Sequence, residues 1–323
     1  MNEAQEQLIR RTIRLHFGQS AAKGILLPLK EGMTNDSFLF AADGKKYIFR
    51  CNGEGTERLI DRENEKAIYE LLSATGITER IVALSTQPGY KISHYYEHSH
   101  VCDPHNAEEV ASCMAALRSF HERRLRGVKS FDPFAELLFY ETLMPAGARR
   151  GSAYTAVREQ VFSLRPFVAL FLEEAATLCH IDAVSDNFLF VEGRERPYLI
   201  DWEYAGLSDP LIDIAMFAIY ADYREDETEQ LIAAYFPEGF DALLRARVHT
   251  YMAVGGLLWY DWSVYKSSLG VTSGRTRKIS FDLRRNTPKK HENYGRCCDG
   301  TVSDVGDARR CERASLGMQQ LSV

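Results

Sequence analysis

The stretch from Cys179 to Phe190 constrains this chain more than any other feature. It reads CHIDAVSDNFLF, a His-x-Asp-x-x-x-x-Asn pattern that opens a short apolar run, and a second short run ends at Asp201. Two apolar runs joined by a turn predict a hairpin of adjacent strands. Such a hairpin lets three oxygen-bearing side chains converge, those of Asp182, Asn187 and Asp201.

This pattern is typical of enzymes that transfer a phosphoryl group. In those sites one Asp orients the attacking hydroxyl, while an Asn and a second Asp hold magnesium ions. We therefore interpret Asp182 as the catalytic residue and Asn187 and Asp201 as magnesium ligands. The alternative is a polar loop beside an ordinary buried hairpin, because Asp and Asn are common in loops. The two apolar runs and the Asp that ends the second one favour the kinase-like interpretation.

The composition is that of a globular protein with a sizeable core. The 323 residues are 45% hydrophobic and 26% charged, enough for one two-lobed domain. A net charge of -6 argues against nucleic-acid binding. We see no secretion-like start and no apolar stretch long enough for a bilayer, and scattered cysteines suit reduced thiols. We therefore expect a cytoplasmic protein with no membrane insertion; the expected small-molecule partner follows from the motifs discussed below.

The periodicity predicts an α+β protein with two lobes. Residues 1–97 are expected to form a small antiparallel-sheet N-lobe that binds the nucleotide, and residues 98–270 a mostly helical C-lobe with the catalytic hairpin and substrate pocket. The expected strands are 25–29, 37–41, 46–50, 81–84 and 90–96. The expected helices are 3–18, 58–73, 107–121, 132–143, 155–177, 209–222, 226–235 and 239–267.

The N-lobe carries candidates for nucleotide binding. A turn over residues 31–37 offers Thr34, Asn35 and backbone N–H groups to phosphate oxygens. Arg50 ends a strand and is the candidate cation for the phosphates, with a solvent-exposed edge arginine as the alternative. Its carboxylate partner is Glu63 or Glu65, and Glu65 is favoured because apolar residues follow it at helical spacing.

The late helix carries two of the three tryptophans at i, i+3 spacing. Trp259 and Trp262 therefore share a helix face, and paired aromatic faces attract a quaternary ammonium group. Core packing is the alternative, because tryptophans at helical spacing are usually core. Glu203, next to Asp201, is a further substrate-binding candidate that would add negative charge.

Three other polar residues are expected to support the site. We expect His180 to brace the catalytic loop and His121, at the end of a helix, to be structural. Asp213 lies near the start of a helix, where its carboxylate can accept backbone N–H groups of the loop and fix the site, with a structural role as the default interpretation.

Residues from about 24 to 270 resemble bacterial choline kinases of the LicA type, in the choline/ethanolamine kinase family of the aminoglycoside-phosphotransferase and protein-kinase-like superfamily. The matching segments are EGMTNDSFLF, YIFRCNGEGTERLIDRENEKAIYELL, CHIDAVSDNFLF, LIDWEYAGLSDPLIDIA and LLWYDWSVYKSSLG. The resemblance implies a protein-kinase-like fold, with ATP as co-substrate and Mg²⁺ as cofactor. It also implies that Arg50 replaces the usual strand lysine, that Trp259 and Trp262 line a choline pocket, and that adenine lies near residues 91–97.

Residues 271–323 depart from that family pattern. They hold 11 Lys and Arg against 6 Asp and Glu and lose the helical periodicity. A frameshift near residues 271–274 is one interpretation, because back-translation of 278–287 in another frame permits a family-like helix. A genuine basic, partly disordered tail is the other. In either case we expect residues beyond about 272 to pack poorly.

Three functions are compared. The first is ATP-dependent phosphorylation of the choline hydroxyl to phosphocholine. The second keeps the phosphotransferase class but takes ethanolamine, another amino alcohol or an aminoglycoside. The third is a catalytically impaired kinase-like binding protein, which the presence of Asp182, Asn187 and Asp201 disfavours.

Overall fold

The structure is a computed structural model that describes residues 3–29, 35–53, 55–56, 58–145, 147, 151–172 and 175–270. Thr34 and the tail from residue 271 onward lie outside the described residues. The chain forms two compact units, Met1–Cys113 with Ser185–Ala205 and Met114–Val184 with Gly206–Val323. The lobe limits at 1–97 and 98–270 remain a prediction.

The first unit contains a five-stranded antiparallel sheet in the order β1-β2-β3-β5-β4. Asp43 and Gly44, at φ of 48° and 72°, make the tight turn between β2 and β3, which pair along their full lengths. Two positive φ values in a two-residue loop suit the twist of a hairpin. The strands are β1 (Leu27–Pro28), β2 (Asn35–Ala42), β3 (Lys45–Asn52), β4 (Ile81–Ser85) and β5 (Tyr90–His94).

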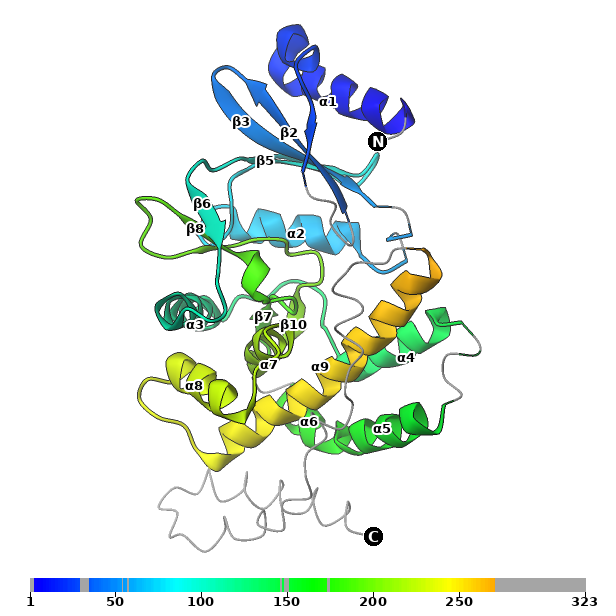
Figure 1. Ribbon diagram of the computed structural model, residues 1–323, viewed down its shortest axis with the longest axis vertical. Helices are drawn as coiled ribbons and strands as arrows, with labels where there is room; N and C mark the ends of the chain where they lie inside the picture. Colours follow the sequence, from blue (N-terminus) through cyan, green and yellow to red (C-terminus); the bar gives the residue numbers. More distant parts are fainter. Residues whose placement is uncertain are drawn as a thin grey trace, which may run out of the picture. The chain divides into compact units, whose positions relative to one another are not determined.

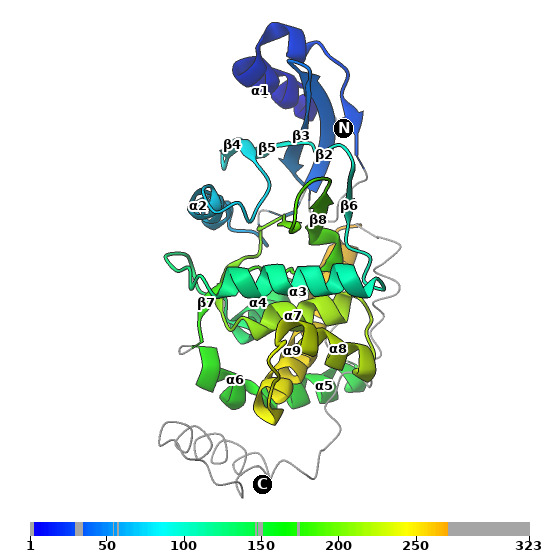
Figure 2. The same ribbon diagram turned by 90° about the vertical axis from the view of Figure 1, so that its left-hand side faces the viewer.

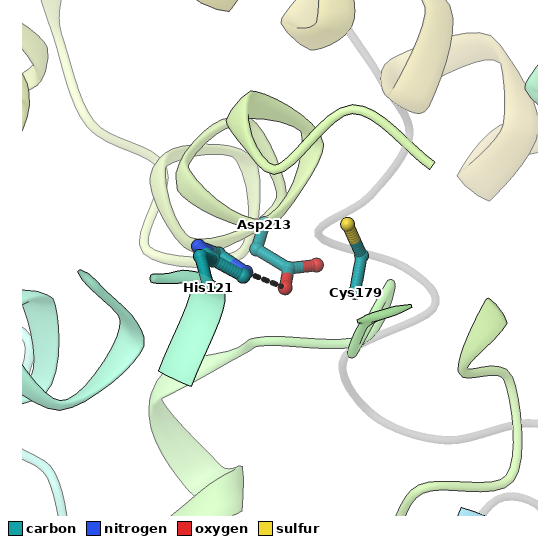
Figure 3. Close-up of side chains that lie close together, drawn as sticks. All are labelled: His121, Cys179 and Asp213. Carbon is teal, nitrogen blue, oxygen red and sulfur yellow. Dashed lines mark hydrogen bonds and ion pairs between the residues drawn. The ribbon is translucent and has the colours of Figure 1, made fainter. Parts of the chain in front are cut away.

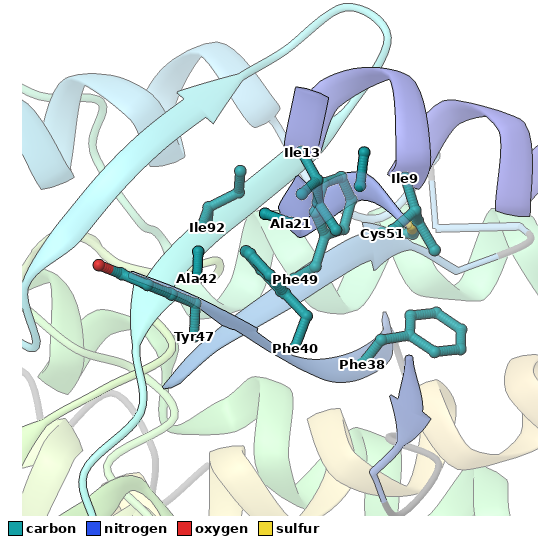
Figure 4. Packing of buried hydrophobic residues seen from close by; sticks show 11 residues of the cluster. Ile9, Ile13, Ala21, Phe38, Phe40, Ala42, Tyr47, Phe49, Cys51 and Ile92 are labelled. Carbon is teal, nitrogen blue, oxygen red and sulfur yellow. The ribbon is translucent and has the colours of Figure 1, made fainter. Parts of the chain in front are cut away.

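Helix α1 (Glu3–Ala22) covers one face of this sheet in both views (Figures 1 and 2). Its buried Ile9 and Ile13 pack in one apolar cluster with Phe40 and Phe49 of the strands (Figure 4). The helix is longer than predicted and is kinked at Gly18, where φ is 83°. This packing supports the sheet from the face that α1 covers.

Helix α2 (Arg62–Leu72) begins later than predicted because Asp61 is its N-cap. The Asp61 carboxylate accepts the backbone N–H groups of Glu63 and Asn64, which satisfies two orphan donors of the first turn. The buried positions recur at i, i+3, i+4 and i+7, which defines one face of the helix. They are Glu65, Ile68, Tyr69 and Leu72.

The predicted hairpin is present in the first unit. Strands β8 (Phe188–Val191) and β9 (Tyr198–Leu199) pair antiparallel, and a short 3₁₀ turn, η1 (Ser185–Asn187), precedes them. Strand β6 (Ser99–Val101) pairs with β8 and was not predicted, because three residues show no measurable alternation. Asn187 thus lies just before the hairpin and Asp201 just after it.

The second unit is mostly helical, as predicted, and α3 (Ala107–His121) crosses the boundary between units. The long helix α9 of the second unit packs against α7 and α4 (Figure 1). The remaining elements are α4 (Pro133–Leu143), α5 (Ser152–Ser163), α6 (Arg165–Leu172), β7 (Thr177–Cys179), β10 (Gly206–Ser208), α7 (Leu211–Tyr220), α8 (Glu225–Tyr235) and α9 (Ala242–Ser268).

The single helix predicted over 155–177 was wrong. Two helices, α5 and α6, meet at Leu164, because Pro166 has no N–H to continue a helix but is tolerated in the first turn of α6. Strand β7 follows and pairs with β10, so this short ladder leads the chain into the loop that contains Asp182. Within the described ranges, no helix has the length and apolar content needed to cross a bilayer.

Candidate active site

Arg50, near the end of β3, pairs with carboxylates from two other segments of the first unit. One guanidinium nitrogen donates to Glu65 of α2, and another donates to Asp201 Oδ1 at 2.6 Å. Glu203 Oε2 lies 3.6 Å from the same Arg50 nitrogen that donates to Asp201. Glu65 is therefore the carboxylate that pairs with Arg50, while Glu63 lies on the exposed side of α2. Burial disfavours the charged guanidinium, but these carboxylates hold the pKa of Arg50 well above its usual value.

Arg62 is a second guanidinium in this network, and the sequence interpretation missed it. It donates to Glu65 Oε2 at 2.7 Å, to Glu203 Oε2 at 3.0 Å and to Asn35 Oδ1 at 3.1 Å. Asn35 in turn donates its amide N–H to Glu203 at 2.8 Å. The available signal was the i, i+3 spacing of Arg62 and Glu65, which places both on one helix face. Thr34, predicted beside Asn35, lies outside the described residues.

The two buried glutamates respond to this network in opposite directions. Burial alone would raise the pKa of Glu65, but the charges of Arg50 and Arg62 outweigh it and lower the pKa to about 2. Burial and the nearby Asp201 raise the pKa of Glu203 despite the same arginines. Glu65 is thus the firmly ionised partner of Arg50, and Glu203 is held by Asn35 and Arg62. A direct contact of Glu203 with substrate stays a prediction.

Asp201 and Asn187 are linked through the backbone of the hairpin. Ile200 donates its N–H to the Asn187 carbonyl at 2.9 Å, and Asp201 follows at once with φ of 66°. Non-glycine residues rarely adopt this left-handed region, and such strain is concentrated at functional sites. The Asp201 side chain is 32% exposed, so a carboxylate oxygen remains accessible. A carboxylate and an amide oxygen are donors that suit Mg²⁺.

Asp182 lies in the second unit, in a loop that a buried carboxylate braces. Asp213, in the first turn of α7, is fully buried and accepts the backbone N–H groups of His180 at 2.8 Å and Ile181 at 2.7 Å. Val184 donates its N–H to the Asp182 carbonyl at 2.8 Å. Asp213 therefore makes the loop contacts expected from the sequence and fixes the backbone of the two residues that precede Asp182.

The Asp213 carboxylate that supports this loop also contacts His121, at the end of α3. His121 Nε2 lies 2.9 Å from Asp213 Oδ2 (Figure 3). His121 Nδ1 lies 2.8 Å from the Tyr235 hydroxyl. Burial raises the pKa of Tyr235, so its hydroxyl can donate to Nδ1 and leave the Nε2 proton for Asp213. Cys179 lies close by, but burial and Asp213 raise the pKa of its thiol well above the usual value. A neutral thiol is a poor metal ligand, so this cluster supports the loop.

Trp259 and Trp262 form a packed indole pair on α9. Their ring centroids are 5.4 Å apart at an interplanar angle of 69°, and Tyr220 of α7 lies 6.2 Å from Trp259. Trp262 is buried, whereas Trp259 is only partly buried. Edge-to-face packing stabilises such a pair.

A buried polar cluster holds the helix segment that carries this pair. Asp261 is fully buried and accepts the Tyr154 hydroxyl at 3.2 Å, while Glu141 lies 3.3 Å from the same hydroxyl. Arg158 makes a two-point contact with Glu141. These hydrogen bonds connect α9 to α4 and α5. They therefore fix the rotation of α9 about its own axis, and with it the direction in which the tryptophan side chains point.

A model described as the phosphotransferase enzyme family matches residues 25–249. The chain belongs to this phosphotransferase family. That match includes Arg50, Asp182 and Asp201 and ends before the α9 residues Trp259, Asp261 and Trp262. The chain is therefore a phosphotransferase, and the predicted enzyme class is confirmed.

Individual proteins are also similar to this chain in sequence. The LicA protein of Haemophilus influenzae is 26% identical over 259 residues, covering 75% of this chain and 74% of that protein. A probable ethanolamine kinase of Arabidopsis thaliana is 24% identical over 272 residues, covering 75% and 71%. The chain is thus similar to a protein named LicA and to one named as a probable ethanolamine kinase.

Solved structures agree on the fold. The choline kinase LicA of Streptococcus pneumoniae superposes with a TM-score of 0.71 at 25% identity, covering 98% of this chain and 100% of that one. A LicA structure in complex with AMP gives 0.73 at 27% identity, covering 88% and 97%. An aminoglycoside phosphotransferase gives 0.58 at 20% identity over 87% and 99%, which shows the shared fold alone. The predicted α+β, protein-kinase-like class is confirmed.

Proposed function

We propose that this chain transfers the γ-phosphoryl group of ATP to the hydroxyl of choline. The observation that carries the choice of choline is the indole pair of Trp259 and Trp262, with a centroid distance of 5.4 Å. A quaternary ammonium group donates no hydrogen bond, so aromatic faces recognise it through cation–π attraction. The relatives named choline kinase support the same substrate.

We assign the phosphate end of the reaction to the first unit. Arg50, held by Glu65, binds phosphate oxygens of ATP, and Asn35 belongs to the same polar group. Asp201 and Asn187 are the proposed Mg²⁺ ligands because they offer the hard oxygen donors that the ion prefers. When bound, Mg²⁺ neutralises charge on the phosphate oxygens.

We assign the acceptor end to the second unit. Asp182 accepts the hydrogen bond of the substrate hydroxyl, orients its oxygen for in-line attack and takes its proton late. Because phosphoryl transfer has a loose transition state, positioning contributes more than strong base catalysis. The brace from Asp213 therefore serves the reaction by fixing the Asp182 backbone. The proposed place of this reaction is the cytoplasm.

Ethanolamine is the second candidate substrate, because relatives named ethanolamine kinase match three quarters of the chain. Its primary ammonium group needs hydrogen-bond acceptors in addition to aromatic faces. The two substrates thus make different demands on the same pocket.

The test compares choline, ethanolamine and an aminoglycoside as acceptors for the purified protein with ATP and Mg²⁺. We expect turnover with the highest kcat/KM for choline and its loss in Asp182→Ala. A higher kcat/KM for ethanolamine would replace choline by the second candidate. Turnover that persists undiminished in Asp182→Ala would remove the proposed mechanism.

A further inference from the structure

A second cation is buried beside Arg50 in the first unit. Lys91 of β5 lies directly opposite Arg50 of β3 in the strand register, and its side chain is 7% exposed. Its ammonium group donates to Glu79 Oε1 at 2.8 Å and to the Tyr69 hydroxyl at 2.6 Å. The Tyr69 hydroxyl also donates to Glu79 Oε1 at 3.2 Å. Lys91, Tyr69 and Glu79 thus form a closed triangle, which we call the Lys91 triad.

The Lys91 triad holds α2 one turn away from the Arg50 contact. Glu65 and Tyr69 are i and i+4 on the buried face of α2. The neighbouring strands β3 and β5 therefore contact the helix at two successive turns, through Arg50 and Lys91. One contact alone would let the helix pivot about the Arg50–Glu65 pair. Two contacts define the direction of the helix and therefore the position of the Glu65 carboxylate.

The same triad reaches the backbone beside Asp201. The second oxygen of Glu79 accepts the Thr78 hydroxyl, and Thr78 Oγ1 accepts the Trp202 indole N–H at 3.1 Å. Trp202 is fully buried, and its N–H also donates to the Leu199 carbonyl at 2.8 Å. Trp202 adjoins Asp201, whose φ of 66° needs support from its surroundings.

Stability alone gives a weak reason for a buried lysine at this place. Replacing a buried ion pair by apolar side chains of similar volume is often neutral or stabilising. What apolar side chains lack is direction, because they fix no particular donor and acceptor atoms. The charge of Lys91 also acts together with Arg50 and Arg62 in lowering the pKa of Glu65.

We propose that Lys91 is a positioning residue for phosphoryl transfer, acting through Tyr69 and Glu79 on Arg50 and Asp201. This inference rests on the nucleotide-binding role of Arg50 in the proposed function and is independent of which acceptor is used. The Lys91 triad sets the helix that carries Glu65 and the backbone that carries Asp201. Both partners of the Arg50 guanidinium are thereby placed before the nucleotide arrives.

The test uses the double variant Lys91→Met with Glu79→Gln, which removes both charges and leaves no unpaired ion. Lys66→Met is the matched control, since Lys66 lies on α2 with an exposed side chain and a long contact of 3.9 Å to Glu70. Three quantities are measured in each protein: the melting temperature, the Kd of a non-hydrolysable ATP analogue, and amide hydrogen exchange along α2. Choline KM is measured beside them.

We expect the folded double variant to bind the nucleotide analogue about tenfold more weakly, a change of about 1.4 kcal/mol. Exchange should accelerate in α2 and stay unchanged in α7 and α9, with choline KM unaltered. Lys66→Met should match the wild type. Wild-type nucleotide affinity in the folded double variant would overturn the inference, as would exchange accelerated equally in α2, α7 and α9. Failure of the proposed function alone would appear as a wild-type protein that binds the nucleotide analogue but does not turn over choline, while the double variant still binds the analogue more weakly.

Discussion

The carboxylate of Asp213 accepts the backbone N–H of Ile181 at 2.7 Å, one residue before Asp182. Ile181 has φ of 68°, a conformation that a β-branched side chain rarely adopts. Strained backbone of this kind persists only where the surroundings hold it. A buried carboxylate on α7 therefore determines where Asp182 points, although it touches no substrate in the mechanism proposed above.

Replacing Asp213 by Ala should therefore reduce both stability and turnover. The change leaves the N–H groups of His180 and Ile181 and the His121 ring without their buried acceptor. Each unpaired buried group costs about 1–3 kcal/mol, so unfolding free energy should fall by roughly 3 kcal/mol or more. Among molecules that remain folded, kcat should fall at least tenfold. Urea unfolding and steady-state kinetics measure the two effects.

The matched control for Asp213 is Asp226→Ala, which removes an exposed carboxylate with only a 3.9 Å contact to Arg224. It should leave stability and kcat near the wild-type values. Asp213→Asn keeps one acceptor oxygen and should fall between the two. Wild-type kcat in folded Asp213→Ala would show that the loop keeps its conformation without the brace.

Arg50→Lys should weaken nucleotide binding while the protein still folds. The two terminal guanidinium nitrogens serve Glu65 and Asp201 separately, whereas a lysine has a single nitrogen on a more flexible stem. We expect KM for ATP to rise about tenfold with little change in KM for choline. Lys46→Arg, at an exposed position near the start of the same strand, is the control. An unchanged KM for ATP would mean that phosphate binding does not depend on the guanidinium.

Trp259→Leu should raise KM for choline and leave KM for ATP unchanged. The lost cation–π contact is worth about 0.5–2 kcal/mol, which corresponds to roughly 2- to 30-fold in affinity. Trp259→Phe keeps an aromatic face and should lose less. Equal effects of both substitutions on melting temperature, with choline KM unchanged, would support the core-packing interpretation of the indole pair instead.

The local motifs were readable from the sequence because their chemistry depends on residue type and short spacing. The hairpin that follows Asn187 and precedes Asp201 was predicted from two apolar runs. Glu65 was favoured over Glu63 because helical spacing puts it on the apolar side of α2, where the structure places it. Roles of these residues in binding nucleotide or metal stay predictions.

The long-range polar contacts were not readable in the same way. Arg62 meets Glu203 across 141 residues of sequence, and Lys91 meets Tyr69 across 22. No periodicity links such pairs, since only the strand register and the direction of α2 bring them together. The break at Leu164 was missed for a different reason: the apolar pattern runs on through Pro166, and the proline was given too little weight.

The last prediction concerns the pH dependence of stability through Glu65. Its pKa in the folded protein is lowered to about 2 from an ordinary value of 4.5, by Arg50 and Arg62 against the opposing effect of burial. A carboxylate whose pKa is lower in the folded than in the unfolded protein stabilises the fold at pH values above its unfolded pKa. The contribution of Glu65 is therefore complete above about pH 4.5 and is lost as the pH falls toward 2. It is on the order of 3 kcal/mol at neutral pH. Glu65→Gln lacks it, so the melting temperatures of the two proteins should differ most near pH 7 and approach each other as the pH falls from about 4.5 toward 2. Glu63→Gln, on the exposed side of α2, controls for the lost negative charge. A difference between wild type and Glu65→Gln that stays constant down to pH 3 would show that the Arg50–Glu65 pair does not hold the carboxylate ionised.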